Sequence, residues 1–254
     1  MGRCVNFRFG STEIVVNVAD QASLLQAAAA RLAGGQGFAL ATLNLDHLVK
    51  LRACAQFRDA YAAQDLIVAD GNPIVWLSHL AGRPVSLVPG SDLVEPLARL
   101  AARAGAKVAL VGSTQTALAA AAIQLARAIP DLNIVLCHAP AMGFDPTGPL
   151  ADQVLADLVR LDVGLCFVAL GAPKQEVFAA RGRRLAPKVG FASVGAGLDF
   201  LAGSQHRAPV WVRRMAMEWA WRAVSSPHRL IPRYAACAAI LPAQINAALR
   251  LRSE

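Results

Sequence analysis

The segment VGLCFVALGAPKQE, Val163–Glu176, decides the fold, because an uninterrupted apolar run passes directly into a polar turn. The run Val163–Leu170 has the length of one strand, and a continuously apolar strand is typical of a parallel sheet that is covered on both faces. Gly171 can end the strand, and Pro173 favours the start of a helix. The segment therefore predicts a strand–loop–helix unit, with Gln175 on the exposed first turn of the helix beside the strand end.

The same pattern recurs along most of the chain. The other strand-like runs are FALATLN (38–44), DLIVADG (65–71), KVALVG (107–112), NIVLCHA (133–139) and VGFASVG (189–195). Amphipathic stretches such as Ser91–Ala104 and Thr114–Ile129 separate them and are expected to be helical. Alternation of this kind predicts an α/β fold, a Rossmann-like and mostly parallel sheet flanked by helices.

The two ends of the chain depart from this alternation. VNFRF and EIVVNV predict a small N-terminal β-hairpin around Gly10 and Ser11, followed by a helix with Asp20 as its N-cap and Gly34–Gly35 as its stop. After Gly203 the pattern is helical only and rich in Arg and Trp. We therefore expect an α/β catalytic domain over residues 1–203 and a helical appendage over residues 204–254.

Composition excludes several classes of protein. Hydrophobic residues make up 56% of the 254 residues and charged residues 17%, which is typical of a folded chain rather than a disordered one. The five cysteines are scattered without C-x-x-C spacing, which argues against a disulfide framework and a zinc site and favours a reducing compartment. No secretory signal is recognisable at the N-terminus, and no segment reaches 18 uninterrupted apolar residues.

The positive charge is concentrated near the C-terminus. The whole chain carries a formal charge of +8, of which residues 206–254 contribute +6 and the preceding 205 residues +2. Every basic residue of this tail is an arginine, namely Arg207, Arg213, Arg214, Arg222, Arg229, Arg233, Arg250 and Arg252. Because the planar guanidinium fork suits phosphate oxygens, the tail predicts an anionic partner: nucleic acid, an anionic lipid or a diphosphate.

Polar side chains follow the strand-like runs. They are Thr42, Asn44, Asp46 and His47 after the first; Asp70; Gly112, Ser113 and Thr114; Lys174, Gln175 and Glu176; and Asp199 after the last. In open α/β sheets ligands bind beyond the carboxyl ends of the strands, so these side chains are expected to share one polar cleft.

Structural alternatives exist for several of these residues. Asp70 precedes a glycine and could be a turn residue. The stretch Gly112–Thr114 could be an ordinary helix cap with Thr114 as N-cap, or an anion site at a helix N-terminus. His47 is expected to be a solvated or hydrogen-bonded helix residue rather than a metal ligand. The sequence alone leaves the choice for Asp70 and for Gly112–Thr114 open.

These residues also lie in a series of motifs that resembles the WecG/TagA/CpsF glycosyltransferases, glycosyltransferase family 26. The resemblance runs from about Ala41 to Tyr234 with order and spacing preserved. Its motifs are TLNLDHLVKL, LIVADGNPIVW, VPGSDL, VALVGS, VALGAPKQE, VGAGLDFLAG, RAPVWV and EWAWRAVSSPHRLIPRY.

The resemblance implies an inverting transfer of a sugar from a UDP-sugar to a sugar hydroxyl on undecaprenyl diphosphate, in bacterial surface polysaccharide or teichoic acid synthesis. N-acetylmannosamine, its uronic acid and a hexose are the donor sugars that it suggests. The catalytic base of the family falls on Asp70. The implied substrate-binding residues are Thr42, Asn44, Asp92, Gln175, Arg207, Arg222, Arg229 and Arg233, and Gly112 and Ser113 are expected to join Gln175 around the nucleotide diphosphate.

Three positions depart from the family pattern. Leu87 stands where a basic residue is usual, so one phosphate or sugar contact is missing or comes from elsewhere, with Arg83 as the candidate. Leu198 replaces a common Phe, which is a packing change. His228 replaces an Arg, which makes one diphosphate contact dependent on pH.

The sequence therefore predicts a cytoplasmic glycosyltransferase that sits peripherally on the inner face of the membrane. No D-x-D pair is present to hold a nucleotide-bound metal, so neither a metal nor another cofactor is expected. The alternative is a binding module: a catalytically silent partner in a polysaccharide assembly complex, or a nucleic-acid binder that uses the arginine tail. The Trp211, Met215 and Trp219 stripe favours a lipid surface over nucleic acid. A homo-oligomer is compatible with the sequence.

Overall fold

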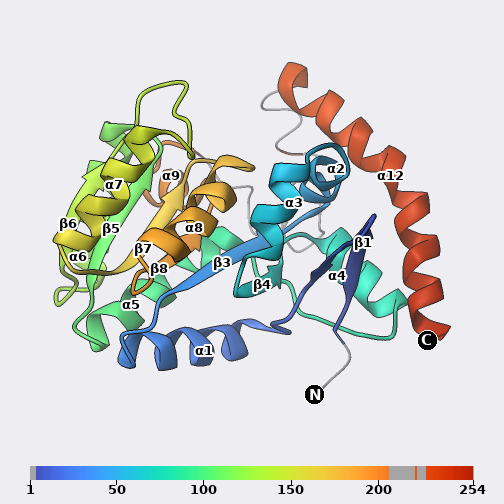
Figure 1. The fold of residues 1–254 in the computed structure, drawn as a ribbon, viewed down its shortest axis with the longest axis horizontal. Helices are drawn as coiled ribbons and strands as arrows, with labels where there is room; N and C mark the ends of the chain where they lie inside the picture. Colours follow the sequence, from blue (N-terminus) through green and yellow to red (C-terminus); the bar gives the residue numbers. More distant parts are fainter. Residues whose placement is uncertain (1–3, 206–220, 222–226, 254) are drawn as a thin grey trace.

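The computed structural model describes residues 4–205, 221 and 227–253 of the chain (Figure 1). Within these residues six strands form one parallel sheet in the order β4-β3-β8-β7-β5-β6. The strands are β3 (Phe38–Leu43), β4 (Leu66–Ala69), β5 (Lys107–Gly112), β6 (Ile134–His138), β7 (Val163–Ala169) and β8 (Gly190–Ser193). Each lies within a predicted run, so the predicted parallel α/β sheet is confirmed.

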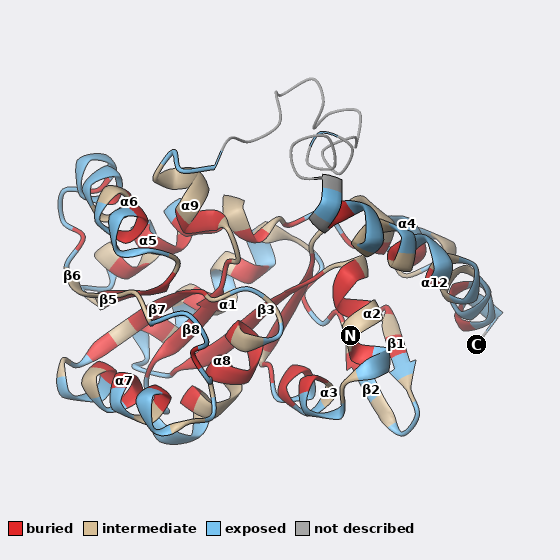
Figure 2. Ribbon diagram, turned by 90° about the horizontal axis from the view of Figure 1, so that it is seen from above, coloured by how far each residue is buried: buried red, intermediate tan, exposed pale blue. Residues whose placement is uncertain are grey.

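Helices cover both faces of the sheet, as Figure 2 shows by the buried strands between two helix layers. The apolar core on one face is built with α1 (Gln21–Ala33), α5 (Val94–Arg103), α6 (Gln115–Ala128) and α9 (Gly197–Leu201). The core on the other face is built with α7 (Pro149–Arg160) and α8 (Lys174–Leu185), and α3 (Ala55–Ala62) packs beside α8. Alternate strand residues serve the two cores, because successive side chains of a strand point to opposite faces.

Side-chain caps explain where two of the helices begin. The Asp20 carboxylate accepts a hydrogen bond from the Ser23 backbone N–H at 2.8 Å at the start of α1, and the Thr114 hydroxyl oxygen accepts from the Ala117 N–H at 3.2 Å at the start of α6. These bonds satisfy backbone donors that have no partner inside the helix. The predicted N-cap Asp20 is confirmed, and Thr114 caps α6 as one of its two alternatives supposed.

A third apolar cluster fills the β4 edge of the sheet. It joins the predicted N-terminal hairpin, β1 (Asn6–Phe9) and β2 (Thr12–Val15), to α2 (Leu45–Ala53) and α4 (Asn72–Leu80). The long C-terminal helix α12 (Pro227–Ser253) lies along this edge (Figure 1) and buries Ile240, Ala248 and Leu251 in the cluster. The described part of the predicted appendage is therefore packed on the body of the molecule, while the division at residue 203 stays a prediction. None of the described helices has the length and apolar character required to cross a membrane.

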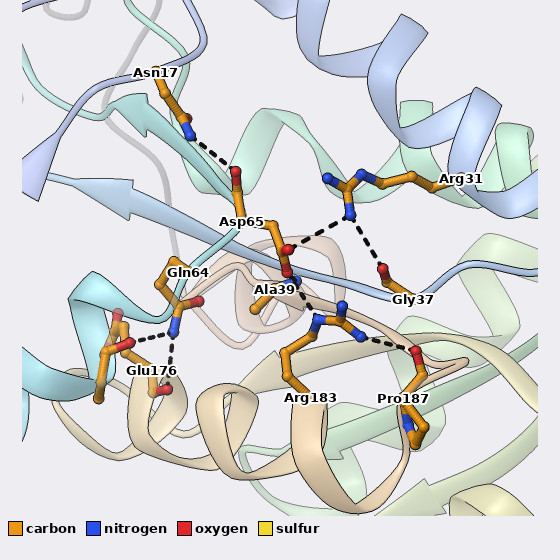
Figure 3. A network of polar contacts seen from close by, with 10 residues as sticks. Asn17, Arg31, Gly37, Ala39, Gln64, Asp65, Glu176, Arg183 and Pro187 are labelled. Atoms are coloured by element: carbon orange, nitrogen blue, oxygen red, sulfur yellow. Dashed lines mark hydrogen bonds and ion pairs between the residues drawn. The ribbon is translucent and has the colours of Figure 1, made fainter.

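A polar cluster fastens the amino end of the sheet (Figure 3). Asp65, directly before β4, accepts hydrogen bonds from the Ala39 backbone N–H and the Arg183 Nε, both at 2.8 Å, and lies 3.5 Å from the Arg31 guanidinium. The Asn17 side chain donates to the Asp65 carbonyl at 2.9 Å. Since this end lies opposite the loops that follow the strands, the cluster holds the layers together without entering the predicted cleft.

One expectation about α8 is wrong. Gln175 is expected on an exposed first turn, but it is only 3% exposed, and its neighbour Glu176 is fully buried. The first turn of α8 faces α3, and the side chain of Gln64, just after α3, donates to the Glu176 carbonyl at 3.1 Å (Figure 3). Packing against this neighbouring helix, which local sequence does not reveal, covers the turn.

Candidate functional site

The carboxyl ends of the strands form a continuous edge. In the register Leu43 pairs with Ala69 and Gly112 with Ala169. After β5 the chain continues to β6, toward one edge of the sheet, whereas after β7 it continues to β8, toward the other edge. The crevice between β5 and β7 is therefore a topological switch point, where ligands of open α/β sheets bind. A side chain at Gly112, whose φ is +117°, would have its Cβ 2.4 Å from the Ala169 carbonyl, so only glycine permits this approach.

Three predicted residues meet at the ends of β3 and β4. The Asp70 backbone N–H donates to the Leu43 carbonyl at 2.7 Å, which places Asp70 next to the start of α2. Asn44 is the N-cap of α2, and its Cβ would be 3.8 Å from a Cβ at Gly71. Thr42 is 3% exposed, and a Cβ at Gly90 would lie 3.1 Å from its hydroxyl oxygen. Asp70 and Asn44 therefore border one partly open corner, and Thr42 is buried near the end of β3 beside Gly90.

A buried polar layer lies under this corner. The His47 backbone N–H donates to Asn44 Oδ1 at 3.1 Å, His47 Nε2 lies 3.4 Å from Asn44 Nδ2, and His47 Nδ1 lies 3.0 Å from the Tyr61 hydroxyl. Burial and the positive charge of Lys50 lower the pKa of His47 to about 3, so the ring is neutral at physiological pH. Burial raises the pKa of Tyr61 well above its usual value, and the charges of Glu176 and Asp70 raise it further.

Gln175 and Glu176 form the adjoining wall after β7. Gln175 Nε2 donates to Glu176 Oε1 at 2.8 Å, and Gln175 Oε1 accepts from the Gly195 backbone N–H at 3.2 Å. The side-chain amide of Gln175 is thereby held between the ends of β7 and β8. Glu176 Oε2 is buried without a hydrogen-bond partner. Burial raises the pKa of Glu176 to about 7, against the lowering effect of the bond from Gln175.

The start of α6 is already occupied by protein contacts. The Ser113 backbone N–H donates to the Ala169 carbonyl at 3.0 Å, and the Ser113 hydroxyl donates to Asp199 Oδ1 in a short contact. Ser113 has a φ of +51°, so a left-handed residue and Gly112 together shape this turn. An anion here would depend on the remaining N–H groups of the α6 N-terminus rather than on the Ser113 N–H.

Asp92 belongs to a different element from Asp70. It sits in the short helix η1 (Gly90–Asp92), and it lines an open groove together with Glu95, Arg99 and Phe200. Gly90, at the start of the same short helix, packs on Thr42 and so connects this segment to the site.

Most of the predicted arginines lie outside the described structure. Arg207 and Arg222 fall outside the described residues, and the side chain of Arg229 is likewise not described. Arg233 of α12 is described: its Nε lies 2.9 Å from Asp46 Oδ1, and Lys50 Nζ lies 2.8 Å from the other carboxylate oxygen. Arg233 therefore reaches the α2 side of the corner. Since Asp46 precedes His47, this pair anchors α12 next to the Asn44 cap.

Arg83 does not take the place of the missing basic residue at position 87. Its guanidinium donates to the Cys4 carbonyl at 3.1 Å and to the Leu251 carbonyl at 3.2 Å. Arg83 therefore ties the two termini of the described chain to the body, near the far end of α12. The side chain of Leu87 is 40% exposed.

The chain matches one family of known proteins over most of its length. The family model described as "Glycosyl transferase WecG/TagA/CpsF family" matches residues 10–253, which covers the whole sheet and extends through α12. The chain belongs to the WecG/TagA/CpsF family. It is therefore a glycosyltransferase.

Several characterised relatives share the name N-acetylglucosaminyldiphosphoundecaprenol N-acetyl-beta-D-mannosaminyltransferase. The Bacillus subtilis (strain 168) protein is 27% identical over 207 residues, 78% of each chain. The Bacillus spizizenii protein is 29% identical over 187 residues, 70% of each chain. The Staphylococcus aureus (strain MW2) protein is 29% identical over 166 residues, 65% of this chain and 63% of the relative.

Sequence reasoning missed the buried layer of this family member. His47 was expected to be a solvated or satisfied helix residue, and it is a satisfied one, buried beneath Asn44. Nothing in the sequence indicated that Tyr61 contacts His47, because it lies on a different helix, 14 residues further along the chain. Glu176 was visible only as a neighbour of Gln175. A polar residue three positions after an N-cap asparagine is the one local hint that the sequence offers.

Proposed function

We propose that the chain transfers a sugar from a UDP-sugar to a hydroxyl of a sugar carried on undecaprenyl diphosphate, with inversion at the transferred carbon. N-acetylmannosamine is the first candidate donor sugar, because the relatives are named as N-acetylmannosaminyltransferases acting on an N-acetylglucosaminyl-diphosphoundecaprenol. Its uronic acid and a hexose are the other candidates. The observation that carries the proposal is the convergence of Asp70, Asn44 and Thr42 at adjacent strand ends of a family member.

Asp70 acts as the general base in this proposal. Its carboxylate removes the proton of the acceptor hydroxyl while the hydroxyl oxygen bonds to the anomeric carbon of the donor. The bond from that carbon to the diphosphate breaks, and UDP leaves with the electron pair. The position of Asp70 after a strand end, in a partly open corner, supports this role, because a general base must lie within hydrogen-bonding reach of the hydroxyl.

The remaining candidates hold the two substrates. Asn44 and Thr42 would bind sugar oxygens beside the base, and the fixed amide of Gln175 would bind the donor across the β5–β7 crevice. Gly112 and Ser113 would contribute through the N-terminus of α6, where a helix dipole favours phosphate. Asp92 would act from the groove next to Thr42. This set requires neither a metal nor another cofactor.

The arginine tail would bring the lipid-linked acceptor to this corner. In the proposal, Arg207, Arg222, Arg229 and Arg233 approach the lipid diphosphate, and residues 204–254 place the enzyme on the membrane surface. Support comes from the tail charge of +6 and from the position of Arg233 beside Asp46. Each basic residue near an anionic membrane contributes about 1 kcal/mol of binding, so such a cluster can localise a chain peripherally.

The test is a transfer assay with purified protein, a panel of UDP-sugars and short-chain prenyl-diphosphate sugars. Asp70→Asn is expected to lower turnover by about two to four orders of magnitude, the usual contribution of a general base. Asp131→Asn, in an exposed turn before β6 at the opposite end of the sheet, is the matched control and should retain wild-type turnover. Retention of more than about a tenth of the rate by Asp70→Asn would transfer the role to Asp92.

A further inference from the structure

A chain of three polar side chains leads from the candidate site into the core. Asn44 stands at the partly open corner, whereas His47 is 4% exposed and Tyr61 is fully buried. The contacts run from Asn44 Nδ2 to His47 Nε2 at 3.4 Å and from His47 Nδ1 to the Tyr61 hydroxyl at 3.0 Å. The proposed reaction uses neither His47 nor Tyr61, although burying both polar groups costs free energy.

The hydrogen-bonding capacity of each atom fixes the direction of this chain. Asn44 Oδ1 is already the acceptor for the His47 backbone N–H, so the amide nitrogen of Asn44 faces the imidazole. An amide nitrogen can only donate, hence His47 Nε2 must be the unprotonated acceptor. A neutral ring then carries its proton on Nδ1 and donates it to the Tyr61 oxygen. The opposite tautomer would set two N–H groups against each other.

The surroundings favour a neutral, fixed ring. Burial lowers the pKa of His47, the positive charges of Lys50 and Arg233 lower it further, and the negative charge of Asp46 opposes them. Phe57 and Tyr61 both meet the imidazole edge to face, with ring centroids 5.8 Å away. The ring therefore has little room to turn, and what can still vary is which of its two nitrogens carries the proton.

Tyr61 ends this chain of polar side chains. Because its oxygen accepts from His47, its own proton is directed to another acceptor. The charges that Glu176 and Asp70 carry when ionised raise the pKa of the Tyr61 phenol further above its usual value. Phe57 packs edge to face on Tyr61 at 5.2 Å and holds the ring in place.

We propose that His47 and Tyr61 are positioning residues: Tyr61 accepts from Nδ1–H and so stabilises the tautomer of His47 whose Nε2 accepts from Asn44, and His47 thereby holds the Asn44 amide with its remaining N–H available to a substrate oxygen beside Asp70. The inference rests on the proposed function of Asn44 and Asp70. A hydrogen-bonded partner of this kind fixes a tautomer and orients a polar group without touching substrate, as second-layer residues do in other sites.

The first test reads the tautomer directly, without substrate. Nitrogen NMR of protein labelled with ¹⁵N-histidine should show His47 as the Nδ1–H tautomer between pH 5 and 8, and its signals are assigned by their loss in His47→Gln. Tyr61→Phe removes the acceptor and should change the tautomer balance or broaden the signals. An Nε2–H tautomer in the wild-type protein would overturn the inference, as would a protonated ring at pH 6.

The second test uses two amides that mimic different ring nitrogens. His47→Gln can place its oxygen near the Nε2 position and still accept from Asn44, whereas His47→Asn can reach only the Nδ1 position and leaves Asn44 without an acceptor. We expect turnover to fall at least about tenfold in His47→Asn, the effect of misdirecting one hydrogen-bonding group, and to stay within about threefold of wild type in His47→Gln. Equal losses of turnover in the two variants would reject a positioning role.

Unfolding temperatures of the His47 variants, together with the turnover of Asp70→Asn, distinguish a failure of this inference from a failure of the proposed function. Both variants remove the packed ring, so comparable drops in unfolding temperature with unequal turnover point to positioning rather than folding. If Asp70→Asn kept full turnover, the proposed function would fail while the tautomer measurement stood. If Asp70→Asn were inactive and the two His47 variants were alike, the inference alone would fail.

Discussion

At the scale of single residues, Glu176 is the most unfavourably placed group in the site. Its carboxyl is fully buried, one of its oxygens has no hydrogen-bond partner, and its pKa rises from 4.5 to about 7. The folded protein therefore favours the protonated form, whereas the unfolded chain ionises at a lower pH. Below about pH 4.5 Glu176 is protonated in both states and does not change the free energy of unfolding. As the pH rises from about 4.5 to about 7, the carboxyl ionises more readily in the unfolded chain, so the free energy of unfolding falls.

This difference predicts how stability depends on pH. A shift from 4.5 to about 7 corresponds to about 3 kcal/mol of unfolding free energy lost as the pH rises through this interval. Glu176→Gln cannot ionise, so its stability relative to the wild-type protein should increase between pH 4.5 and pH 8. Urea unfolding at several pH values measures the difference, in which other titrating groups cancel. A difference that stays constant with pH would show that Glu176 ionises normally.

At the scale of secondary structure, α2 begins at a residue that serves two purposes. Asn44 caps the helix through the His47 N–H and also borders the Asp70 corner. Its geometry is therefore set by the helix, because the cap fixes which way the amide turns. Asp20 caps α1 in the same manner, with its side chain accepting from Ser23, and it is not one of the candidate site residues.

The two caps provide a matched pair of variants. Asn44→Ala and Asp20→Ala should each reduce the unfolding free energy by about 1 kcal/mol, because each leaves a helix N–H without its partner. Only Asn44→Ala should also lower sugar transfer, by at least about tenfold. Urea midpoints and the transfer assay, measured side by side, check both statements. Full activity of Asn44→Ala would restrict the residue to its role as a cap.

At the scale of the whole molecule, α12 decides whether residues 204–254 are separable. From sequence alone, deletion after Gly203 is expected to leave a folded, soluble body. The packing favours a different outcome, because α12 covers the hairpin, α2 and α4 with buried side chains such as Ile240 and Leu251. Removing it would expose that apolar cluster to water, so we expect the truncated chain to be destabilised and prone to aggregate.

Point variants in α12 measure this coupling without a truncation. Ile240 is 6% exposed, and Ile240→Ala should reduce the unfolding free energy by about 2–4 kcal/mol in a single cooperative transition. Leu249 on the same helix is 47% exposed, and Leu249→Ala should change it by no more than about 0.5 kcal/mol. Denaturant unfolding followed by fluorescence gives both values. An Ile240→Ala protein as stable as Leu249→Ala would mean that α12 is an independent appendage.

The sequence by itself determined the parts of this protein that depend on local interactions. Apolar runs of strand length, the caps Asp20 and Thr114, and the hairpin at Gly10 were all readable because period, capping and turn chemistry act over a few residues. The sequence also indicated that the polar strand exits lie along one edge of the sheet, because parallel strands end at a common edge, whereas their shared cleft stays a prediction. The family motifs led to the enzyme class, which the family match confirms.

Only the tertiary structure decided which of those polar residues are buried and whom they contact. Gln175 and Glu176 are covered because α3 packs against α8, and Tyr61 reaches His47 from a separate helix. Arg83 holds the termini instead of facing the cleft, since Cys4 and Leu251 meet there in space. Such contacts join residues far apart in the chain, and their energies depend on desolvation by the neighbours that folding supplies. A linear sequence specifies those neighbours only through the completed fold.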